Sequence, residues 1–147
     1  MQILGKKYRL SSGKNQKITA TELVISGDKE FFHRRVCSVA QKLLLPYVQT
    51  KALEFSKQIG VKHGRITLRN TSSRWGSCSS TRNLSFCWKI AFSPLYVIDY
   101  LVAHEISHLV QMDHSIKFWQ LVDSITDTRR KAEKWLKENG RKLQSIR

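Results

Sequence analysis

Apolar and polar residues partly alternate at the start of the chain, from Gln2 to Leu10 and again from Gln16 to Ile25. Such alternation is typical of strands that bury one face. The polar segment Ser11–Asn15 between the two stretches predicts a loop. We therefore expect residues 2–25 to form an N-terminal hairpin.

Beyond this region, apolar residues recur at helical spacing. A stripe from Phe32 to Ile59 predicts one helix bent at Pro46, or two helices that separate there. A further helix is expected from Pro94 to about Met112, with Ser93 as its N-cap. Two more helices are expected, over residues 116–125 and 127–139, and Gly140 is expected to end the second. A basic tail, residues 141–147, follows.

Two short strands are predicted between the helices. Arg65–Arg69 is the first, and Leu84–Phe92, with Phe86, Trp88 and Ile90 on one parity, is the second. The segment that connects them is rich in serine and threonine. With 147 residues, the chain fits one domain spanning residues 1–147 and is long enough to bury a core.

Composition narrows the class of protein. No apolar run approaches the ~18 residues that a membrane span needs, and the first ten residues lack the apolar centre of a signal peptide. The three cysteines form no C-x-x-C pair, which favours a reducing compartment and hence a cytoplasmic location. The 26 Lys and Arg against 11 Asp and Glu give a net charge of +15, which attracts polyanions.

The helix expected after Ser93 carries the motif His104-Glu105-Ile106-Ser107-His108. Residues four apart lie on the same helix face, so both imidazoles can reach one metal ion. His114 is a candidate third ligand if the chain turns back after the helix ends at Asp113. Imidazole suits Zn²⁺, and three protein ligands leave a fourth position open for water. In this motif the glutamate is the general base rather than a ligand, so Glu105 is the expected catalytic residue.

The spacing H-E-x-x-H-x5-H also matches that of the metzincins. Their pattern has a glycine three residues after the second histidine, where this chain has Gln111. The difference argues against a metzincin and places the turn elsewhere, at Asp113. An alternative is that the histidines lie on a helix surface and that Glu105 forms a local ion pair.

Several linked segments carry a resemblance to a known family. They are Ser73-Arg74-Trp75-Gly76-Ser77-Cys78-Ser79-Ser80, Asn83–Pro94, Val97–Tyr100, His104–Leu109, Asp113-His114-Ser115, Phe118-Trp119 and, near the start, Gly5-Lys6-Lys7-Tyr8. In these segments the chain resembles the YgjP-like metallopeptidases, relatives of the SprT-like proteases. This sequence differs from the family pattern in two ways. It has Cys87 where the family more often has asparagine, and it starts after the point where other members commonly carry an additional N-terminal β-rich stretch.

The resemblance implies an α+β, zincin-like fold in which a small, mostly antiparallel sheet packs on the HExxH helix. It also implies a zinc ion held by His104, His108 and His114, with Glu105 as the catalytic residue. It names no substrate more specific than a peptide or protein.

The segment Arg74–Ser80 is expected to border the cleft as an edge strand and loop, where an edge strand can align an extended peptide. Arg74 either contacts the substrate or its oxyanion, or pairs with an acidic residue while Trp75 packs in the core and Gly76 permits a close approach. Phe118 and Trp119 are expected to pack beneath His114 and hold it in place.

The predicted function is that of a zinc metallopeptidase, which hydrolyses peptide bonds with a metal-activated water. The alternative is a basic nucleic-acid-binding module with a structural zinc site, or a DNA-associated protease, because no acidic residue occurs from Phe55 to Ile98. The basic residues also fit an ordinary solvated surface. A structural zinc site needs four protein ligands, and only three are evident, which favours catalysis.

Overall fold

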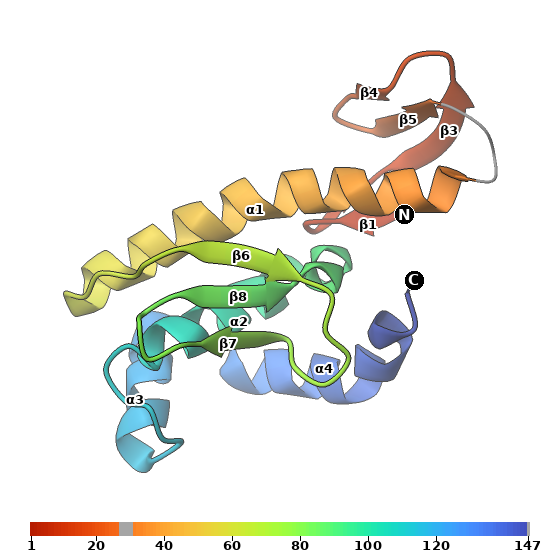
Figure 1. The fold of residues 1–147 in the computed structure, drawn as a ribbon. Coiled ribbons are helices and arrows are strands. Elements are labelled where there is room, and N and C mark those ends of the chain that lie inside the picture. Colours follow the sequence, from red (N-terminus) through yellow and green to blue (C-terminus); the bar gives the residue numbers. More distant parts are fainter. Residues whose placement is uncertain (27–30, 147) are drawn as a thin grey trace.

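The computed structural model describes residues 1–26 and 31–146. The helices in these ranges are α1 (Phe32–Ile59), the 3₁₀ segment η2 (Trp88–Phe92), α2 (Leu95–Ser107), α3 (Ile116–Ile125) and α4 (Arg129–Gln144) (Figure 1). The strands are β1 (Gln2–Ile3), β2 (Lys6–Lys7), β3 (Arg9–Gly13), β4 (Lys17–Ile18), β5 (Glu22–Ser26), β6 (Ile66–Arg69), β7 (Gly76–Cys78) and β8 (Leu84–Cys87). Small sheets and helices are thus combined in one chain, which confirms the α+β class.

The sheet nearest to α2 has the strand order β6-β8-β7. β7 and β8 are antiparallel, with Ser77 opposite Ser85, whereas β6 and β8 are parallel, with Leu68 opposite Phe86. The expectation of a mostly antiparallel sheet is therefore wrong, and the sheet is mixed. The reason is that β8 returns between the two earlier strands instead of adding to the edge of a meander. As a result β7 is an edge strand.

The N-terminal strands also pair differently from the expected hairpin over residues 2–25. β3 and β5 are parallel, with Leu10 opposite Leu23, and the short β4 pairs antiparallel with β5. β1 and β2 form a separate two-stranded ribbon. The alternating pattern correctly predicted strands. The second stretch, from Gln16 to Ile25, contains two strands rather than one. The chain turns between them at Thr19–Thr21, where Thr19 and Glu22 exchange hydrogen bonds.

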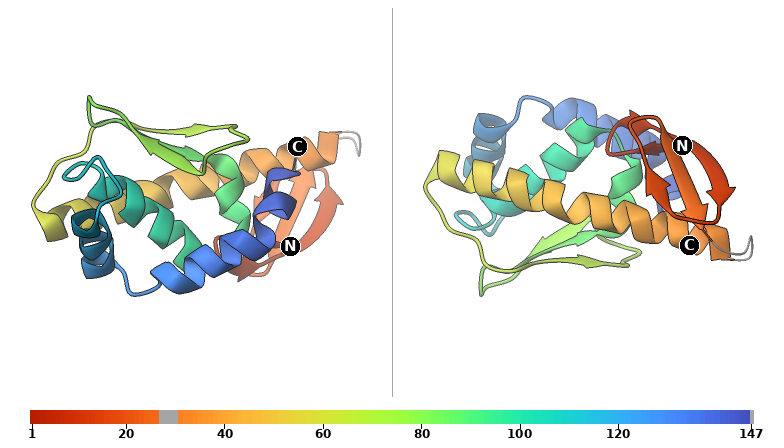
Figure 2. Two further views of the ribbon diagram at one scale, coloured as in Figure 1. Left: turned by 90° about the horizontal axis from the view of Figure 1, so that it is seen from below. Right: turned by 90° about the horizontal axis from the view of Figure 1, so that it is seen from above.

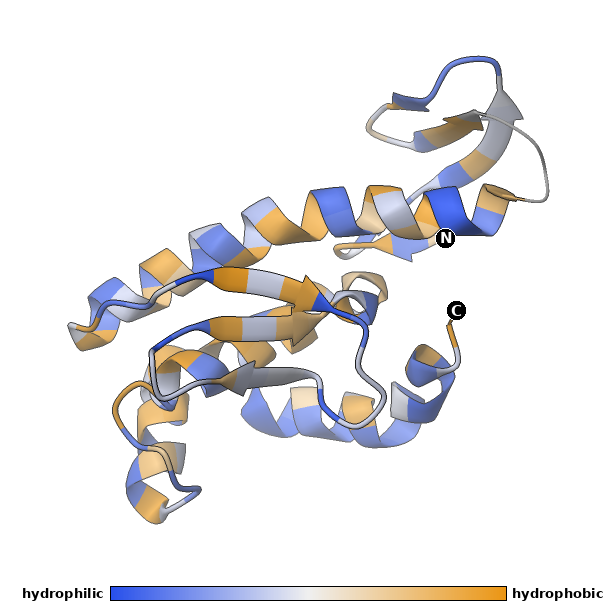
Figure 3. Ribbon diagram, in the orientation of Figure 1, coloured by the Kyte–Doolittle hydropathy of each residue, from blue (hydrophilic) through white to orange (hydrophobic). Residues whose placement is uncertain are grey.

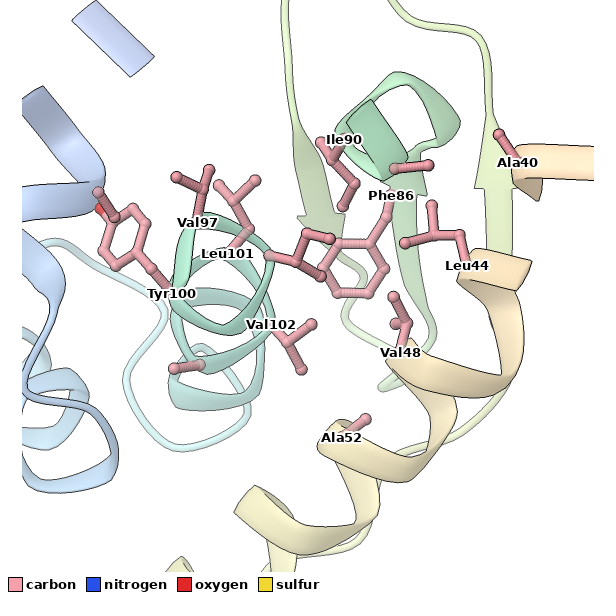
Figure 4. Close-up of a cluster of buried hydrophobic side chains, with 14 of the residues drawn as sticks. Ala40, Leu44, Val48, Ala52, Phe86, Ile90, Val97, Tyr100, Leu101 and Val102 are labelled. Atoms are coloured by element: carbon pink, nitrogen blue, oxygen red, sulfur yellow. The ribbon is translucent and has the colours of Figure 1, made fainter. Parts of the chain in front are cut away.

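The core is built where the β6-β8-β7 sheet meets α1 and α2. Phe86 of β8, only 1% exposed, points between the side chains of α1, such as Leu44 and Val48, and those of α2, such as Val102 (Figure 4). Burying a side chain of this size contributes about 1.5–3 kcal/mol. α1 and α2 both pack on the face of the sheet that carries Phe86, and no helix of the described ranges covers the opposite face (Figure 2). The packing therefore fixes α2 relative to β7.

β8 ends at Cys87, earlier than the strand expected to reach Phe92, and the chain continues as η2. Trp88, Lys89, Ile90 and Ala91 are all buried in succession, which a strand with one solvated face cannot achieve. The ammonium group of Lys89 donates to the carbonyl oxygen of Gln144 at 2.9 Å. Tight turns thus direct four consecutive side chains inward.

α2 begins one residue later than expected. Its N-cap is Pro94 rather than Ser93, and no side-chain hydrogen bond caps it. The Ser93 hydroxyl instead donates to the carbonyl oxygen of Ile90 at 2.6 Å, so the preceding 3₁₀ turn holds it.

α2 also ends earlier than the predicted Met112. After Ser107 two hydrogen bonds are of the i→i−3 type, from the N–H of Leu109 to the carbonyl oxygen of Ile106 and from that of Val110 to Ser107, before the N–H of Gln111 also bonds to Ser107. Asp113 is not among the described residues with a positive φ, so the predicted left-handed turn at this residue is wrong. Tightening of the last helical turn replaces it.

α4 continues through Gly140 to Gln144, so the predicted end of the helix at Gly140 is wrong. Most of the segment expected to be a basic tail, residues 141–147, is helical instead. Leu143 in this extension is 5% exposed, and its burial stabilises the last turn. Outside its buried side, α4 is strongly hydrophilic (Figure 3). None of the helices in residues 1–26 and 31–146 has the length and apolar character needed to cross a membrane.

Candidate metal centre

Three imidazoles converge at the C-terminal end of α2. His104 and His108 lie one turn apart on the same face, and His114 returns to them from the turn before α3. Their ring centroids are 4.9 Å apart for His104 and His108, 5.3 Å for His104 and His114, and 4.8 Å for His108 and His114. One candidate ligand atom from each residue lies within 4.8 Å of the other two.

The environment of His108 fixes its tautomer. Its Nδ1 lies 2.9 Å from the carbonyl oxygen of Gln111. A carbonyl can only accept, so Nδ1 carries the proton and Nε2 keeps a free lone pair. Burial lowers the pKa of His108 below its usual value, partly opposed by this hydrogen bond and by the charge of Glu105. The ring also stacks on Phe118, with centroids 4.4 Å apart and planes at 19°.

Glu105 is buried beside the cluster, with 6% of its surface exposed. Its Oε1 lies 3.0 Å from Nδ1 of His104, so an ionised carboxylate accepts from that nitrogen and leaves Nε2 of His104 free. Its Oε2 is buried and has no hydrogen-bond partner among the described residues. A buried carboxylate oxygen without a partner costs free energy, so a group absent from the protein chain is expected to satisfy it.

His114 is exposed but held on one side by aromatic rings. Its ring stacks on Trp119, with centroids 5.9 Å apart at 26°, and meets Phe118 edge-on at 5.1 Å. The guanidinium of Arg129 covers Trp119 at 4.8 Å from the ring centroid. Ser115 caps α3 by accepting from the N–H of Phe118, which places both aromatic residues in the first turn of the helix that follows the histidine. This is the packing expected from the sequence.

The edge strand β7 forms the opposite wall of the site. A Cβ added to Gly76 would lie 3.1 Å from Cγ of Glu105, so only glycine lets the strand approach the helix this closely. A cleft of about 260 Å³ opens between them, lined by Arg74, Gly76, Ser77, Cys78, His104, Glu105, His108, Met112 and His114. The predicted position of the Arg74–Ser80 segment beside the cleft is therefore correct.

The donor set fits a zinc ion. Tetrahedral zinc with Zn–N distances near 2.0–2.1 Å places its nitrogen ligands about 3.3 Å apart. The three candidate atoms lie within 4.8 Å of one another, so modest ring rotations bring them to a common ion. Two of the three rings have a hydrogen bond at Nδ1, which is the usual way in which a metal-binding histidine is oriented.

Sequence reasoning missed two features of the site. The first is the carbonyl of Gln111 that orients His108; a backbone group leaves no signal in the residue type. The second is Cys78, which lines the cleft and whose pKa is raised by burial and by the nearby Glu105. The two-residue spacing between Gly76 and Cys78 on a strand places both on the side that faces α2.

Comparison with known proteins identifies the family of the chain. No curated protein and no solved structure matches the chain. A family model described as YgjP-like, metallopeptidase domain, matches residues 1–139 of the 147. It spans the whole histidine cluster, Glu105 and the edge strand. The chain therefore belongs to the YgjP-like family of metallopeptidase domains.

Proposed function

We propose that the protein is a zinc-dependent peptidase with a zincin-like active site. His104, His108 and His114 hold the metal, and Glu105 is the general base. The observation that carries the proposal is the unpartnered Oε2 of Glu105, buried in the same cleft as three convergent imidazoles. A structural zinc site would instead be closed by a fourth protein ligand.

The reaction is assigned to the residues as follows. A bound zinc ion supplies Lewis acidity, which activates water and polarises the scissile carbonyl. Glu105 accepts at Oε2 the proton that water loses as its oxygen bonds to the carbonyl carbon. The protonated Glu105 then gives this proton to the amide nitrogen as the C–N bond breaks. The products are a carboxylic acid and an amine, with no covalent enzyme intermediate.

The edge strand β7 is suited to positioning the substrate. It pairs with β8 on one side, and no strand of the described ranges pairs with its other side. An extended peptide can add to such an edge through main-chain hydrogen bonds. Because Gly76 brings the strand against Glu105, a peptide paired there lies beside the general base.

A cytoplasmic location fits the three cysteines. Cys37, Cys78 and Cys87 are all free. Free thiols are typical of reducing compartments, where disulfides do not persist.

The test is a comparison of the zinc-loaded parent with Glu105→Gln on casein and a peptide library. Loss of the general base should lower the hydrolysis rate by about 100–10,000-fold, while zinc binding persists. Glu138→Gln, which changes an exposed carboxylate on α4, is the matched control and should cleave like the parent. Equal rates for Glu105→Gln and the parent would refute the assignment of the base.

A further inference from the structure

A second pocket opens on the far side of β7. It has a volume of about 450 Å³. Arg69 and Arg74 line it together with Thr71, Ser73, Ser77 and Ser85, and none of its lining residues is acidic. The pocket is therefore rich in hydrogen-bond donors and carries uncompensated positive charge.

Arg74, Gly76 and Ser77 line both this pocket and the metal cleft, and the alternation of side chains along the strand indicates which side of the sheet each pocket lies on. Gly76 faces inward, because a Cβ there would meet Glu105 and Phe86. Ser77 therefore faces outward, where its hydroxyl hydrogen-bonds to that of Ser85 on β8. This outward face is the side of the sheet that α1 and α2 leave uncovered (Figure 2).

The two arginines have no anion of their own. Within residues 1–26 and 31–146, neither guanidinium takes part in an ion pair or a side-chain hydrogen bond. Arg74 lines both this pocket and the metal cleft, so it stands where the two meet. The planar guanidinium presents paired donors that match a carboxylate.

We propose that this pocket, hereafter the outer pocket, binds an acidic side chain of the substrate and makes the enzyme selective for Asp or Glu near the scissile bond. The proposal rests on the proposed peptidase function. A peptide that extends the sheet at β7 points successive side chains to opposite faces. While one residue faces the metal cleft, its neighbour faces the outer side of the sheet, where Arg74, two residues before β7, is the nearer arginine and Arg69, on β6, lies beyond β8.

Charge decides which side chains the outer pocket accepts. A carboxylate offsets half of the charge of the two guanidinium groups and can accept hydrogen bonds from them. A glutamine of the same shape lacks the charge, and a lysine repels both arginines. Arg69 and Arg74 are thus specificity-determining residues, acting on a substrate side chain and not on the scissile bond.

Binding tests the proposal without relying on turnover. Two fluorescein-labelled, unstructured peptides are compared by anisotropy at physiological salt, one with several glutamates and one with glutamine at each of those positions. The parent should bind the glutamate peptide about tenfold or more tightly than the glutamine peptide. The double variant Arg69→Gln/Arg74→Gln should lose most of that preference.

The matched control removes the same net charge elsewhere. Lys14→Gln/Lys42→Gln changes two exposed lysines, on the β3–β4 turn and on α1, and should keep the preference. If both double variants lose it equally, the preference comes from the overall charge of +15, and the proposal is wrong. If the arginine pair affects only a salt-dependent affinity for single-stranded DNA, the outer pocket belongs to a polyanion site and the proposal is again wrong.

Cleavage gives an independent readout. On a peptide that the parent cleaves, exchanging the residue beside the scissile bond from Glu to Gln should raise KM more than it lowers kcat. Arg69→Gln/Arg74→Gln should reduce the ratio of the two KM values towards one, and an unchanged ratio in this double variant would contradict the proposal. Failure of the zinc-loaded parent to cleave any peptide would count against the proposed function, while the binding comparison would still decide the outer pocket.

Discussion

Gly76 lies so close to Glu105 that a Cβ on residue 76 would be only 3.1 Å from Cγ of the glutamate. The same Cβ would lie 3.2 Å from Cδ1 of Phe86 and from the carbonyl oxygen of Ser85. A side chain at residue 76 therefore cannot be accommodated unless the core or the proposed base moves. Gly76 therefore connects the strand that we propose aligns the substrate to the carboxylate that we propose is the base.

Gly76→Ala should consequently reduce activity out of proportion to its effect on folding. Overpacking of this kind costs about 1–3 kcal/mol. The displaced Glu105 should lower kcat, whereas the three histidines should still bind zinc with near-parental affinity. Urea unfolding, zinc titration and peptide hydrolysis measure the three effects separately.

Gly140→Ala is the control for this substitution. Its new Cβ would lie 3.5 Å from the ring of Trp75, an ordinary contact, and Gly140 is inside α4. Replacing glycine by alanine within a helix stabilises by roughly 0.5–1 kcal/mol. A Gly76→Ala enzyme as active and as stable as the Gly140→Ala enzyme would show that the close approach has no role.

Phe118→Leu should weaken zinc binding more than it weakens the fold. The ring of Phe118 stacks on His108 and meets His104 at 5.0 Å and His114 at 5.1 Å, so it supports all three proposed ligands. Loss of such outer support typically costs about 10–100-fold in metal affinity. Phe55→Leu, another buried phenylalanine, on α1, should destabilise by a similar ~1–2 kcal/mol and leave zinc affinity unchanged. Equal zinc affinities in the two variants would contradict the supporting role.

Zinc should stabilise the parent through binding linkage. At a free zinc concentration 100 times Kd, the free energy of unfolding should rise by about 2.7 kcal/mol. His114→Ala should remove most of this gain. Because His114 is exposed, the metal-free variant should unfold much like the metal-free parent. His63→Ala keeps the proposed ligand set and should keep the gain; thermal unfolding with and without zinc measures both.

Tyr47 and Asp99 should produce a pH-dependent stability. The Tyr47 hydroxyl donates to Oδ1 of Asp99 at 2.6 Å and ties α1 to α2. Burial raises the pKa of Asp99 above its usual value, while this hydrogen bond and the charge of Lys51 lower it. Folding therefore becomes less favourable as pH rises from the unfolded pKa of this carboxyl through its raised folded value.

Tyr47→Phe removes the donor and should raise the pKa of Asp99 further. The loss of stability should be about 1.5–3 kcal/mol at pH values above the raised folded pKa of Asp99, where the charged carboxylate needs the donor, and smaller at pH values below it. In the Asp99→Asn background the same substitution should show no such pH dependence. Urea unfolding across this range measures the difference, and a loss independent of pH in both backgrounds would contradict the coupling.

The sequence predicted those features that depend on local spacing. The long stripe from Phe32 to Ile59 corresponds to α1, with Pro46 inside it, and the i, i+4 relation of His104 and His108 corresponds to one helix face. The placement of Phe118 near Ser115 also follows from chain order, since Phe118 is only three positions after the cap.

Features that depend on long-range packing were not predictable in this way. The strand expected to reach Phe92 becomes a 3₁₀ turn at Trp88 because four consecutive side chains are buried. The parallel pairing of β6 with β8 and the hydrogen bond from His108 to Gln111 involve backbone groups that residue types do not reveal. The outer pocket likewise needs β6, β7 and β8 side by side before Arg69 and Arg74 can share it.

The most direct test of the zinc site is X-ray absorption spectroscopy on the zinc-loaded parent. We predict three imidazole nitrogens at about 2.0–2.1 Å and a light-atom fourth neighbour, with one zinc per chain. Sulfur scattering at about 2.3 Å would instead place the thiol of Cys78 on the metal and close the site. Fewer than three imidazoles would equally contradict the proposed ligands.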